Sequence, residues 1–323
     1  MEDNALYDLI IIGGGPAGLA AGLYAMRATL RTVLIERGVF GGQVATTKDV
    51  ENYLGIEEIS GFELSEKFYN HAKSYGLPTI RAEVRALKPG KRHHSITLDD
   101  NTTLHAHAII IAAGSSPRKL NIPGEQEYQG KGVSYCAKCD GLFFKDQTVV
   151  VAGGGDTATE EAIYLAKLAK RVHMVHLEDN LRAGKILRNR LMNECNVEIH
   201  PNATISEIKG KNGGVSSTVI KEVLTGKSWE LPTDGVFVFI GLAPNNRLIP
   251  FGIRKTPGGH VITDEKGGTT IPGIFVAGDL RHKYAKQISV AVADGCVSAL
   301  AAATYIEMKK EEKLFCDLYV TAA

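Results

Sequence analysis

Cys136 and Cys139, within SYCAKCDG, are the residues whose type and spacing most directly indicate chemistry. A C-x-x-C pair can be a structural disulfide, half of a metal site, or a disulfide that opens and closes during turnover. Closing so short a loop would stabilise the fold by only about 2 kcal/mol. The other three cysteines stand alone, and His173 and His176 lie inside an alternating apolar run, so zinc-finger spacing is lacking. We therefore interpret the pair as a redox centre and expect no metal site.

The composition restricts the classes of protein to which the chain can belong. Its 323 residues, of which 44% are hydrophobic and 23% charged, suffice for two compact domains. With 37 basic against 36 acidic residues, no positive excess is available for a phosphate backbone, so we expect no nucleic-acid partner. The first apolar run, from Leu9 to Ile12, is too short for a signal sequence or a membrane span. Five cysteines do not form a secreted disulfide framework, so we expect a cytoplasmic protein without a membrane partner.

A redox disulfide needs an electron source, and the N-terminal segment YDLIIIGGGPAGLAAGLYA indicates one. An apolar β-run is followed by Gly13, Gly15 and Gly18 in G-x-G-x-x-G spacing, and then by an Ala- and Leu-rich helical stretch. In order, these glycines permit a tight turn, the approach of a pyrophosphate, and close packing of helix on strand. The next strand ends at Glu36, where a carboxylate that binds a ribose hydroxyl is expected. The segment predicts a dinucleotide-binding fold.

The same pattern recurs in QTVVVAGGGDTATEEAIYLAKLAKRVHMVHLE. Gly153, Gly155 and Ala158 occupy the three glycine positions, and Glu178 occupies the position of the acid. Two such folds predict two dinucleotides, which we interpret as a bound flavin and an exchangeable nicotinamide. The predicted fold class is α/β, with two Rossmann-like three-layer dinucleotide-binding domains.

Further motifs indicate which fold binds the flavin. After the second strand, the loop GVFGGQVATTKDVENYLG contains Gly41, Gly42 and Asn52, which suit close backbone contact with a flat ring. Towards the C-terminus, TTIPGIFVAGDL predicts a β-run that ends at Gly278 and Asp279. Together with AAGSSPR, CAKCDG and GGGDTATEEA, these motifs extend over nearly the full length of the chain. The chain resembles the low-molecular-weight thioredoxin reductases of the two-dinucleotide-fold flavoprotein superfamily.

This resemblance implies the position of the flavin. FAD lies on the N-terminal fold in that family, and the matching residues outside the glycine turn are Gly42, Gln43, Asn52 and Asp279. Asp279 would bond to the ribityl chain of FAD. Gln287 and Ile288 would begin a helix whose positive end stabilises negative charge on the reduced flavin.

The resemblance also implies that the nicotinamide domain is inserted into the FAD domain. Two β-runs that end in Gly, Pro and polar residues, AAGSSPRKLNIPG and GLAPNNRLIPFG, mark the crossings. We expect residues 1–118 and 247–323 to form the FAD domain and residues 119–246 to form the inserted domain. In the family the inserted domain rotates about its two linkers, so that the flavin faces either the nicotinamide or the disulfide.

The two cysteines have different roles in this family. By resemblance Cys139 lies against the flavin, Cys136 attacks the disulfide of a thioredoxin-like partner, and Asp140 supplies or accepts the proton. Asp140 favours a reductase, because dithiol oxidases of the same superfamily tend to carry His after the second cysteine. Such an oxidase is one alternative function, and a non-catalytic flavin-binding redox sensor is another.

The sequence departs from the family after the second strand of the inserted domain. Reductases specific for NADPH carry HRR-x-x-x-R there, whereas this chain has Leu177 and Glu178 in place of the paired arginines and retains Arg182. A carboxylate repels a 2′-phosphate but accepts a hydrogen bond from a free 2′-hydroxyl. We therefore expect NADH as the donor, with ferredoxin or another reductant as the alternative.

The C-terminal tail, YIEMKKEEKLFCDLYVTAA, carries apolar residues beyond the usual final helix. We interpret it as a dimer or domain contact, in line with the homodimer that the family suggests. The alternative is that Tyr319 covers the flavin ring.

Overall fold

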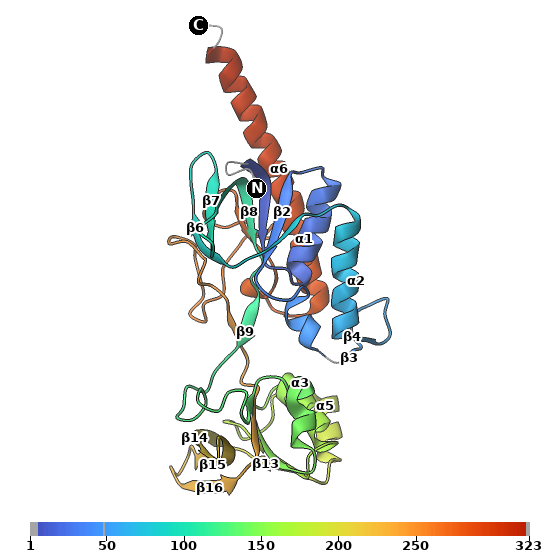
Figure 1. The fold of residues 1–323 in the computed structure, drawn as a ribbon, viewed down its shortest axis with the longest axis vertical. Helices are drawn as coiled ribbons and strands as arrows, with labels where there is room; N and C mark the ends of the chain where they lie inside the picture. Colours follow the sequence, from blue (N-terminus) through green and yellow to red (C-terminus); the bar gives the residue numbers. More distant parts are fainter. Residues whose placement is uncertain (1–5, 48, 321–323) are drawn as a thin grey trace. The chain divides into compact units, whose positions relative to one another are not determined.

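The computed structural model describes residues 6–47 and 49–320, with side chains for residues 6–47 and 50–311 (Figure 1). The chain folds into two units. Unit 1 combines Met1–Ser115 with Pro244–Ala323, and unit 2 is Ser116–Ala243. The two crossings form strands β9 (Ser115–Pro117) and β18 (Leu242–Pro244), which pair with each other. The boundaries expected from the sequence, after residues 118 and 246, each lie three residues beyond the boundaries of the two units.

The main sheet of unit 1 has the strand order β5-β2-β1-β8-β7-β6, with β19 also paired to β8. Its parallel strands are β5 (Thr79–Arg81), β2 (Thr32–Glu36), β1 (Leu6–Ile12), β8 (Thr103–Ile111) and β19 (Ile274–Val276). Strands β6 (Val84–Lys88) and β7 (His94–Leu98) pair antiparallel. The central run from Leu9 to Ile11 is fully buried, because a parallel sheet is covered on both faces.

In the part of unit 1 that the structure describes, α-helices accompany this sheet (Figure 1). They are α1 (Pro16–Arg27), α2 (Gly61–Ser74) and α6 (Ile288–Val320), and the short elements of unit 1 are η1 (Gly42–Thr46), β3 (Asp49–Val50), β4 (Ile59–Ser60) and η3 (Gly278–Leu280). Helix α1 begins with Pro16, which supplies a helical φ where no N–H is needed, and α2 begins with a capping box between Ser60 and Glu63. Helices α1 and α6 approach closely, since a Cβ on Gly295 would lie 2.0 Å from the carbonyl oxygen of Ala17.

Helix α6 is, among the described residues, the one helix that is long and apolar enough to cross a membrane by length and composition alone. The segment concerned is Ile288–Glu311, with a mean hydropathy of 1.5 and 39% of its window buried inside the protein. Ala299, Ala302 and Ile306 of this helix belong to the apolar core that contains Leu9 and residues of α1. A core helix of a soluble protein meets the same criterion, so the finding carries little weight for a membrane.

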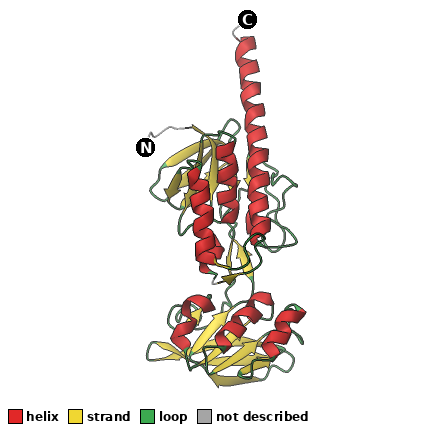
Figure 2. Ribbon diagram, turned by 90° about the vertical axis from the view of Figure 1, so that its right-hand side faces the viewer, coloured by secondary structure: helices red, strands yellow, loops and turns green. Residues whose placement is uncertain are grey.

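Unit 2 has three layers: helices, a parallel sheet and an antiparallel sheet. Figure 2 shows its helices and strands. The middle layer is a parallel sheet of β10 (Val133–Ser134), β17 (Gly235–Val238), β11 (Thr148–Ala152), β12 (Arg171–Val175) and β13 (Val197–His200), in that order. One apolar core packs it against helices α3 (Ala137–Asp140), α4 (Asp156–Ala166) and α5 (Lys185–Met192), with η2 (Gly141–Phe144) following α3. A second core packs it against the antiparallel strands β14 (Ala203–Lys211), β15 (Gly214–Glu222) and β16 (Ser228–Pro232). The predicted α/β class with two dinucleotide-type folds is confirmed.

Candidate functional site

The candidate redox centre lies at the start of α3 in unit 2. Cys136 and Cys139 form a disulfide, with their Cα atoms 5.3 Å apart. Cys136 is the N-cap of α3, and its Sγ accepts a hydrogen bond from the backbone N–H of Cys139 at 3.1 Å. That N–H can stabilise negative charge on Cys136 once the disulfide opens. Asp140 is the last residue of α3, and its backbone N–H donates to the carbonyl of Cys136 at 3.2 Å.

Side chains around the disulfide fix its position. The hydroxyl of Ser134 accepts the N–H of Cys136 at 3.0 Å and donates to the carbonyl of Cys136 at 3.1 Å. Lys138, between the two cysteines, lies 3.8 Å from the carboxylate of Glu161 on α4. Burial raises the pKa of Glu161, whereas the charge of Lys138 lowers it. The redox segment Cys136–Cys139 is thus held by contacts with both β10 and α4.

The first glycine turn lies between β1 and α1 and has the three environments expected from its spacing. Gly13 has a φ of +108°, and a Cβ there would lie 2.3 Å from the carbonyl oxygen of Ala112. On Gly18 a Cβ would lie 1.8 Å from the carbonyl oxygen of Gly13. On Gly15 the nearest neighbour would be the Cα of Gly42, at 3.9 Å. Packing therefore excludes any side chain at Gly13 and Gly18, whereas Gly15 has space in front of it.

Glu36, at the end of β2, is held against this turn. Its Oε2 accepts the N–H of Gly14 at 2.6 Å, and its Oε1 accepts the N–H of Gly38 at 2.7 Å. A carboxylate has about four acceptor positions, so two protein bonds leave capacity for ribose hydroxyls. The acid is thereby positioned before any ligand binds.

Several residues expected near a flavin ring contact distant parts of the chain within unit 1. The side-chain amide of Asn52 donates to Gln287 at 3.4 Å, across 235 residues of sequence. Helix α6 begins at Ile288, directly after Gln287, whose carbonyl accepts the N–H of Ala291. Gln43 donates to the carbonyl of Ser115 at 3.1 Å. Its neighbour Gly42, with a φ of +57°, faces Gly15 as described above.

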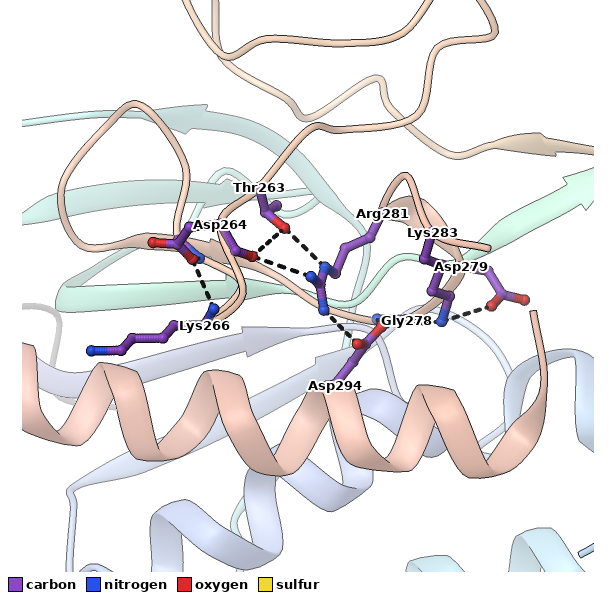
Figure 3. Close-up of polar contacts among 9 residues, drawn as sticks. Thr263, Asp264, Lys266, Gly278, Asp279, Arg281, Lys283 and Asp294 are labelled. Carbon is purple, nitrogen blue, oxygen red and sulfur yellow. Dashed lines mark hydrogen bonds and ion pairs between the residues drawn. The ribbon is translucent and has the colours of Figure 1, made fainter. Parts of the chain in front are cut away.

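A charged network surrounds the Gly278-Asp279 turn (Figure 3). Asp294, buried on α6, accepts the N–H of Gly278 at 3.0 Å, pairs with Lys283 at 3.0 Å, and also pairs with Arg281. Arg281 extends the network by donating to the Thr263 hydroxyl at 2.9 Å. The turn that carries Asp279 is therefore fixed by buried ion pairs.

Asp279 itself has an oxygen without a hydrogen-bond partner in the described part of the chain. This buried atom, Oδ1, lies 3.3 Å from Nζ of Lys283, a contact that is an ion pair and not a hydrogen bond. A buried carboxylate oxygen that has an ion pair but no hydrogen bond can still accept one from a ligand. A hydroxyl of a bound group would satisfy it.

The second glycine turn, between β11 and α4, repeats the geometry of the first. Gly153 has a φ of +136°, and its Cβ would lie 2.3 Å from the carbonyl oxygen of Phe239. Around a Cβ on Gly155 no heavy atom of the described chain lies within 4 Å, and Ala158 is fully buried. The first and third positions of the turn are thus tightly packed, whereas the second has free space in front of it.

The loop after β12 lies beside this second turn. The backbone N–H of Arg182 donates to the carbonyl of Gly154 at 2.8 Å. The side chain of Arg182 pairs with Glu178 at 3.2 Å, and 74% and 49% of these two side chains are exposed. Leu177 is also exposed, whereas burial lowers the pKa of the neighbouring His176. The structure therefore brings Glu178 and Arg182 together next to the glycine turn.

Comparison with known proteins identifies the family. The sequence profile described as pyridine nucleotide-disulphide oxidoreductase matches residues 7–295. The chain belongs to this family. It is 43% identical over 314 residues to the thioredoxin reductase of Bacillus subtilis (strain 168), covering 96% of this chain and 98% of that protein.

Solved structures of relatives have the same fold. The crystal structure of Lactococcus lactis thioredoxin reductase matches with a TM-score of 0.90 and 40% identity, over 94% of this chain and 99% of that one. The crystal structure of T. acidophilum thioredoxin reductase matches with a TM-score of 0.86 and 34% identity, over 93% and 98% of the two chains.

This pyridine nucleotide-disulphide oxidoreductase fold implies FAD, and the residues present fit that group. A Cβ on Gly15 would meet no atom closer than 3.9 Å, so this position can admit a pyrophosphate, while Glu36 and the buried Oδ1 of Asp279, which has no hydrogen bond, offer acceptors for hydroxyls. The side chain of Tyr319 lies outside the described residues.

Sequence reasoning missed several residues of the candidate site. Arg281, Lys283 and Asp294 were not anticipated, although Asp294 is the single acid in the apolar run ISVAVADGCVSALAA. Leu142 and Phe143, directly after the redox segment, are 67% and 77% exposed. Consecutive apolar residues after a reactive motif were the signal that could have identified them.

Proposed function

We propose that this protein is an FAD-dependent thioredoxin reductase, which passes two electrons from a reduced donor through the Cys136–Cys139 disulfide to a thioredoxin-like protein. The observation that carries the proposal is this disulfide at the N-cap of α3, in an inserted unit that has its own dinucleotide turn. The relatives named thioredoxin reductase, which align over nearly the whole chain, support the substrate.

The proposed FAD site lies in unit 1. Gly15 and Gly42 would admit the pyrophosphate, Glu36 would hold the adenosine ribose, and Asp279 would accept a ribityl hydroxyl. Asn52, Gln287 and Ile288 would lie at the ring end, where the N-terminus of α6 favours negative charge. When bound, FAD would supply the two electrons that open the disulfide.

The chemistry proposed for the protein's own residues is thiol–disulfide exchange. The thiolate of Cys136, stabilised by the N–H of Cys139, attacks the partner's disulfide, forming a mixed disulfide and releasing one partner thiolate. Cys139 then attacks Sγ of Cys136, re-forming the internal disulfide and releasing the second partner thiolate. The partner gains two electrons, and Asp140 transfers the protons that its thiols require.

A partner must dock beside this disulfide. The exposed side chains of Leu142 and Phe143 in η2 lie two and three residues after Asp140 and offer an apolar contact next to it. Large exposed apolar side chains of this kind are typical of interaction sites. We therefore propose that they contact the thioredoxin-like partner.

The electron donor is proposed to be NADH. Glu178 would accept a hydrogen bond from a 2′-hydroxyl, and Arg182, which a 2′-phosphate would need, is paired with Glu178. Ferredoxin or another reductant is the alternative, and anaerobic reduction of the bound flavin by NADH, NADPH and reduced ferredoxin in turn distinguishes them. A homodimer is also proposed, and sedimentation of the purified protein tests it.

The decisive experiment separates the roles of the two cysteines. Cys136→Ser should leave a Cys139 thiolate beside oxidised flavin and show a long-wavelength charge-transfer band. Cys139→Ser should lack this band and should trap a mixed disulfide with the partner through Cys136. Both variants should lose thioredoxin reduction while the donor still reduces their flavin. Retained turnover in both, or the band in the Cys139 variant, would contradict the assignment.

A further inference from the structure

Two histidines and a glutamate meet on adjacent strands of unit 2, away from the redox segment. His173 lies on β12, and Glu198 and His200 lie on β13. The parallel register places His173 opposite Glu198 and Val175 opposite His200. Paired residues of adjacent parallel strands point to the same face, and alternate residues of one strand do so as well, so all three side chains share the face of Val175. Val175 belongs to the core that packs this sheet against β14–β16.

Their ligand atoms are spaced as a metal ion requires. Nδ1 of His173 lies 3.0 Å from Nε2 of His200, and the carboxylate oxygens of Glu198 lie 3.5 Å and 3.7 Å from these two nitrogens. Ligands about 2.0–2.2 Å from a tetrahedral ion are separated by about 3.3–3.6 Å. Shifts of a few tenths of an ångström would therefore bring all three onto one ion.

We propose that His173, Glu198 and His200 bind a divalent transition-metal ion, with water as the fourth ligand. Imidazole nitrogens with one carboxylate suit zinc and neighbouring ions and do not suit magnesium or calcium, which prefer oxygen ligands. This proposal departs from the expectation of no metal site and does not rest on the reductase activity.

The burial of the three side chains suits a metal site, because two ligands are ordered by packing and the third leaves a path for the ion. His173 and His200 are 5% and 16% exposed, so their positions are restricted by packing, and the His200 ring lies 6.0 Å from that of Trp229. Glu198 is 54% exposed, which gives an ion and its water a path from solvent. Burial lowers the pKa of both histidines, because desolvation disfavours the charged ring.

The competing interpretation is that the two rings are satisfied by hydrogen bonding to each other. A neutral imidazole has one donor and one acceptor nitrogen, so the 3.0 Å contact can be such a bond. That interpretation assigns no role to the Glu198 carboxylate near both nitrogens. The two interpretations differ in whether an ion binds with a dependence on Glu198.

Zinc binding to the oxidised holoenzyme tests the proposal. The protein must be free of a histidine tag and keep its Cys136–Cys139 disulfide closed, because reduced thiols would bind zinc themselves. Cys195→Ser removes an exposed free thiol as a competing ligand. Titration calorimetry and metal analysis after dialysis should then give one Zn²⁺ per chain.

Glu198→Gln is the informative variant, because this side chain is exposed and its loss should not disturb folding. Losing even an outer-shell partner costs about 10–100-fold in metal affinity, so zinc binding should weaken at least about tenfold. Glu127→Gln, which removes another exposed carboxylate of unit 2, should leave zinc binding unchanged. His200→Asn, checked for flavin content and circular dichroism, should behave like Glu198→Gln.

Two results would overturn the proposal. One is zinc affinity in Glu198→Gln equal to that of the wild type. The other is the absence of saturable binding to the wild type up to about 1 mM free Zn²⁺.

Discussion

The two glycine turns share one sequence pattern yet hold their acidic residues differently. Glu36 accepts two backbone N–H bonds, from Gly14 and Gly38, and is fixed against its turn. Glu178 extends to solvent, with half of its side chain exposed, and pairs with the still more exposed Arg182. The pattern thus specifies strand, turn and helix, while the loop after the second strand determines whether the acid is fixed.

The ion pairs around the two turns also differ in burial: those near the first turn are buried, and the one near the second is exposed. Near the first turn, Asp294, Arg281 and Lys283 form buried ion pairs around the Gly278-Asp279 segment. The second turn is contacted by a loop whose ion pair lies in solvent. The first arrangement suits a permanently bound cofactor, and the second suits one that exchanges in every cycle.

Asp294→Ala should give the largest difference between the two regions. It leaves two largely buried cations without their carboxylate, and breaking a buried pair in this way costs about 3–5 kcal/mol. Urea denaturation should show this loss of stability, and extraction should show less bound FAD. The matched change Glu178→Ala breaks an exposed pair and should cost about 0–1 kcal/mol. Equal costs would remove the contrast between the two regions.

The third position of the glycine motif, which is Gly18 in the first turn and Ala158 in the second, gives a second and smaller contrast. Gly18→Ala places a methyl group against the carbonyl of Gly13, and such overpacking should cost at least about 1–3 kcal/mol and release FAD. Ala158→Gly introduces no clash and should cost about 1 kcal/mol through helix propensity, with FAD retained. Thermal unfolding and flavin content of the two variants measure this. Normal flavin content in Gly18→Ala would refute the packing argument.

Changing the exposed acid should alter donor preference without altering the fold. With Leu177→Arg and Glu178→Arg combined, the loop gains two guanidinium groups beside that of Arg182, and each charge-assisted contact with a 2′-phosphate contributes about 1.5–3 kcal/mol. The ratio of kcat/KM for NADPH to that for NADH should rise at least about tenfold. Glu36→Gln serves as the comparison, because it should affect FAD content and leave that ratio unchanged. An unaltered ratio in the double variant would mean that this loop does not contact the nucleotide.

The smallest effect concerns the helices that follow the two turns. Helix α1 carries no acid, whereas α4 carries Glu161, whose pKa is raised by burial. A carboxyl group with a raised folded-state pKa contributes stability below its ordinary pKa of 4.5 and loses that contribution as pH rises through the folded value. Glu161→Gln should therefore gain stability relative to the wild type as pH rises above about 4.5. Urea midpoints measured across this range, with exposed Glu127→Gln as the control, would show a constant difference between Glu161→Gln and the wild type if burial does not raise the pKa of Glu161.

Much of the fold could be predicted because its signals are local. The buried run around Leu9, the spacing from Gly13 to Gly18 and the repeat from Gly153 each indicate a strand, turn or helix within a short window. The redox pair was equally local, since Cys136 and Cys139 are three residues apart.

The remainder depends on contacts that no short window contains. Asn52 meets Gln287 across 235 residues, and Asp294 reaches Gly278 from a different element. The cluster of His173 with His200 follows from the parallel register of two strands, which hydrophobic periodicity does not specify. Glu178 was predicted beside its turn, but its pairing with Arg182 depends on how the loop closes.

The insertion of unit 2 has a consequence for biosynthesis. Strand β19 completes the sheet of unit 1 by pairing Ile274 with Ile109 of β8, and all of unit 2 lies between these residues in the chain. A nascent chain can therefore assemble the contiguous unit 2 on the ribosome while unit 1 still lacks β19 and α6. Asp279, which we propose to bind FAD, follows β19, so loading of FAD would wait until translation of the chain is almost finished.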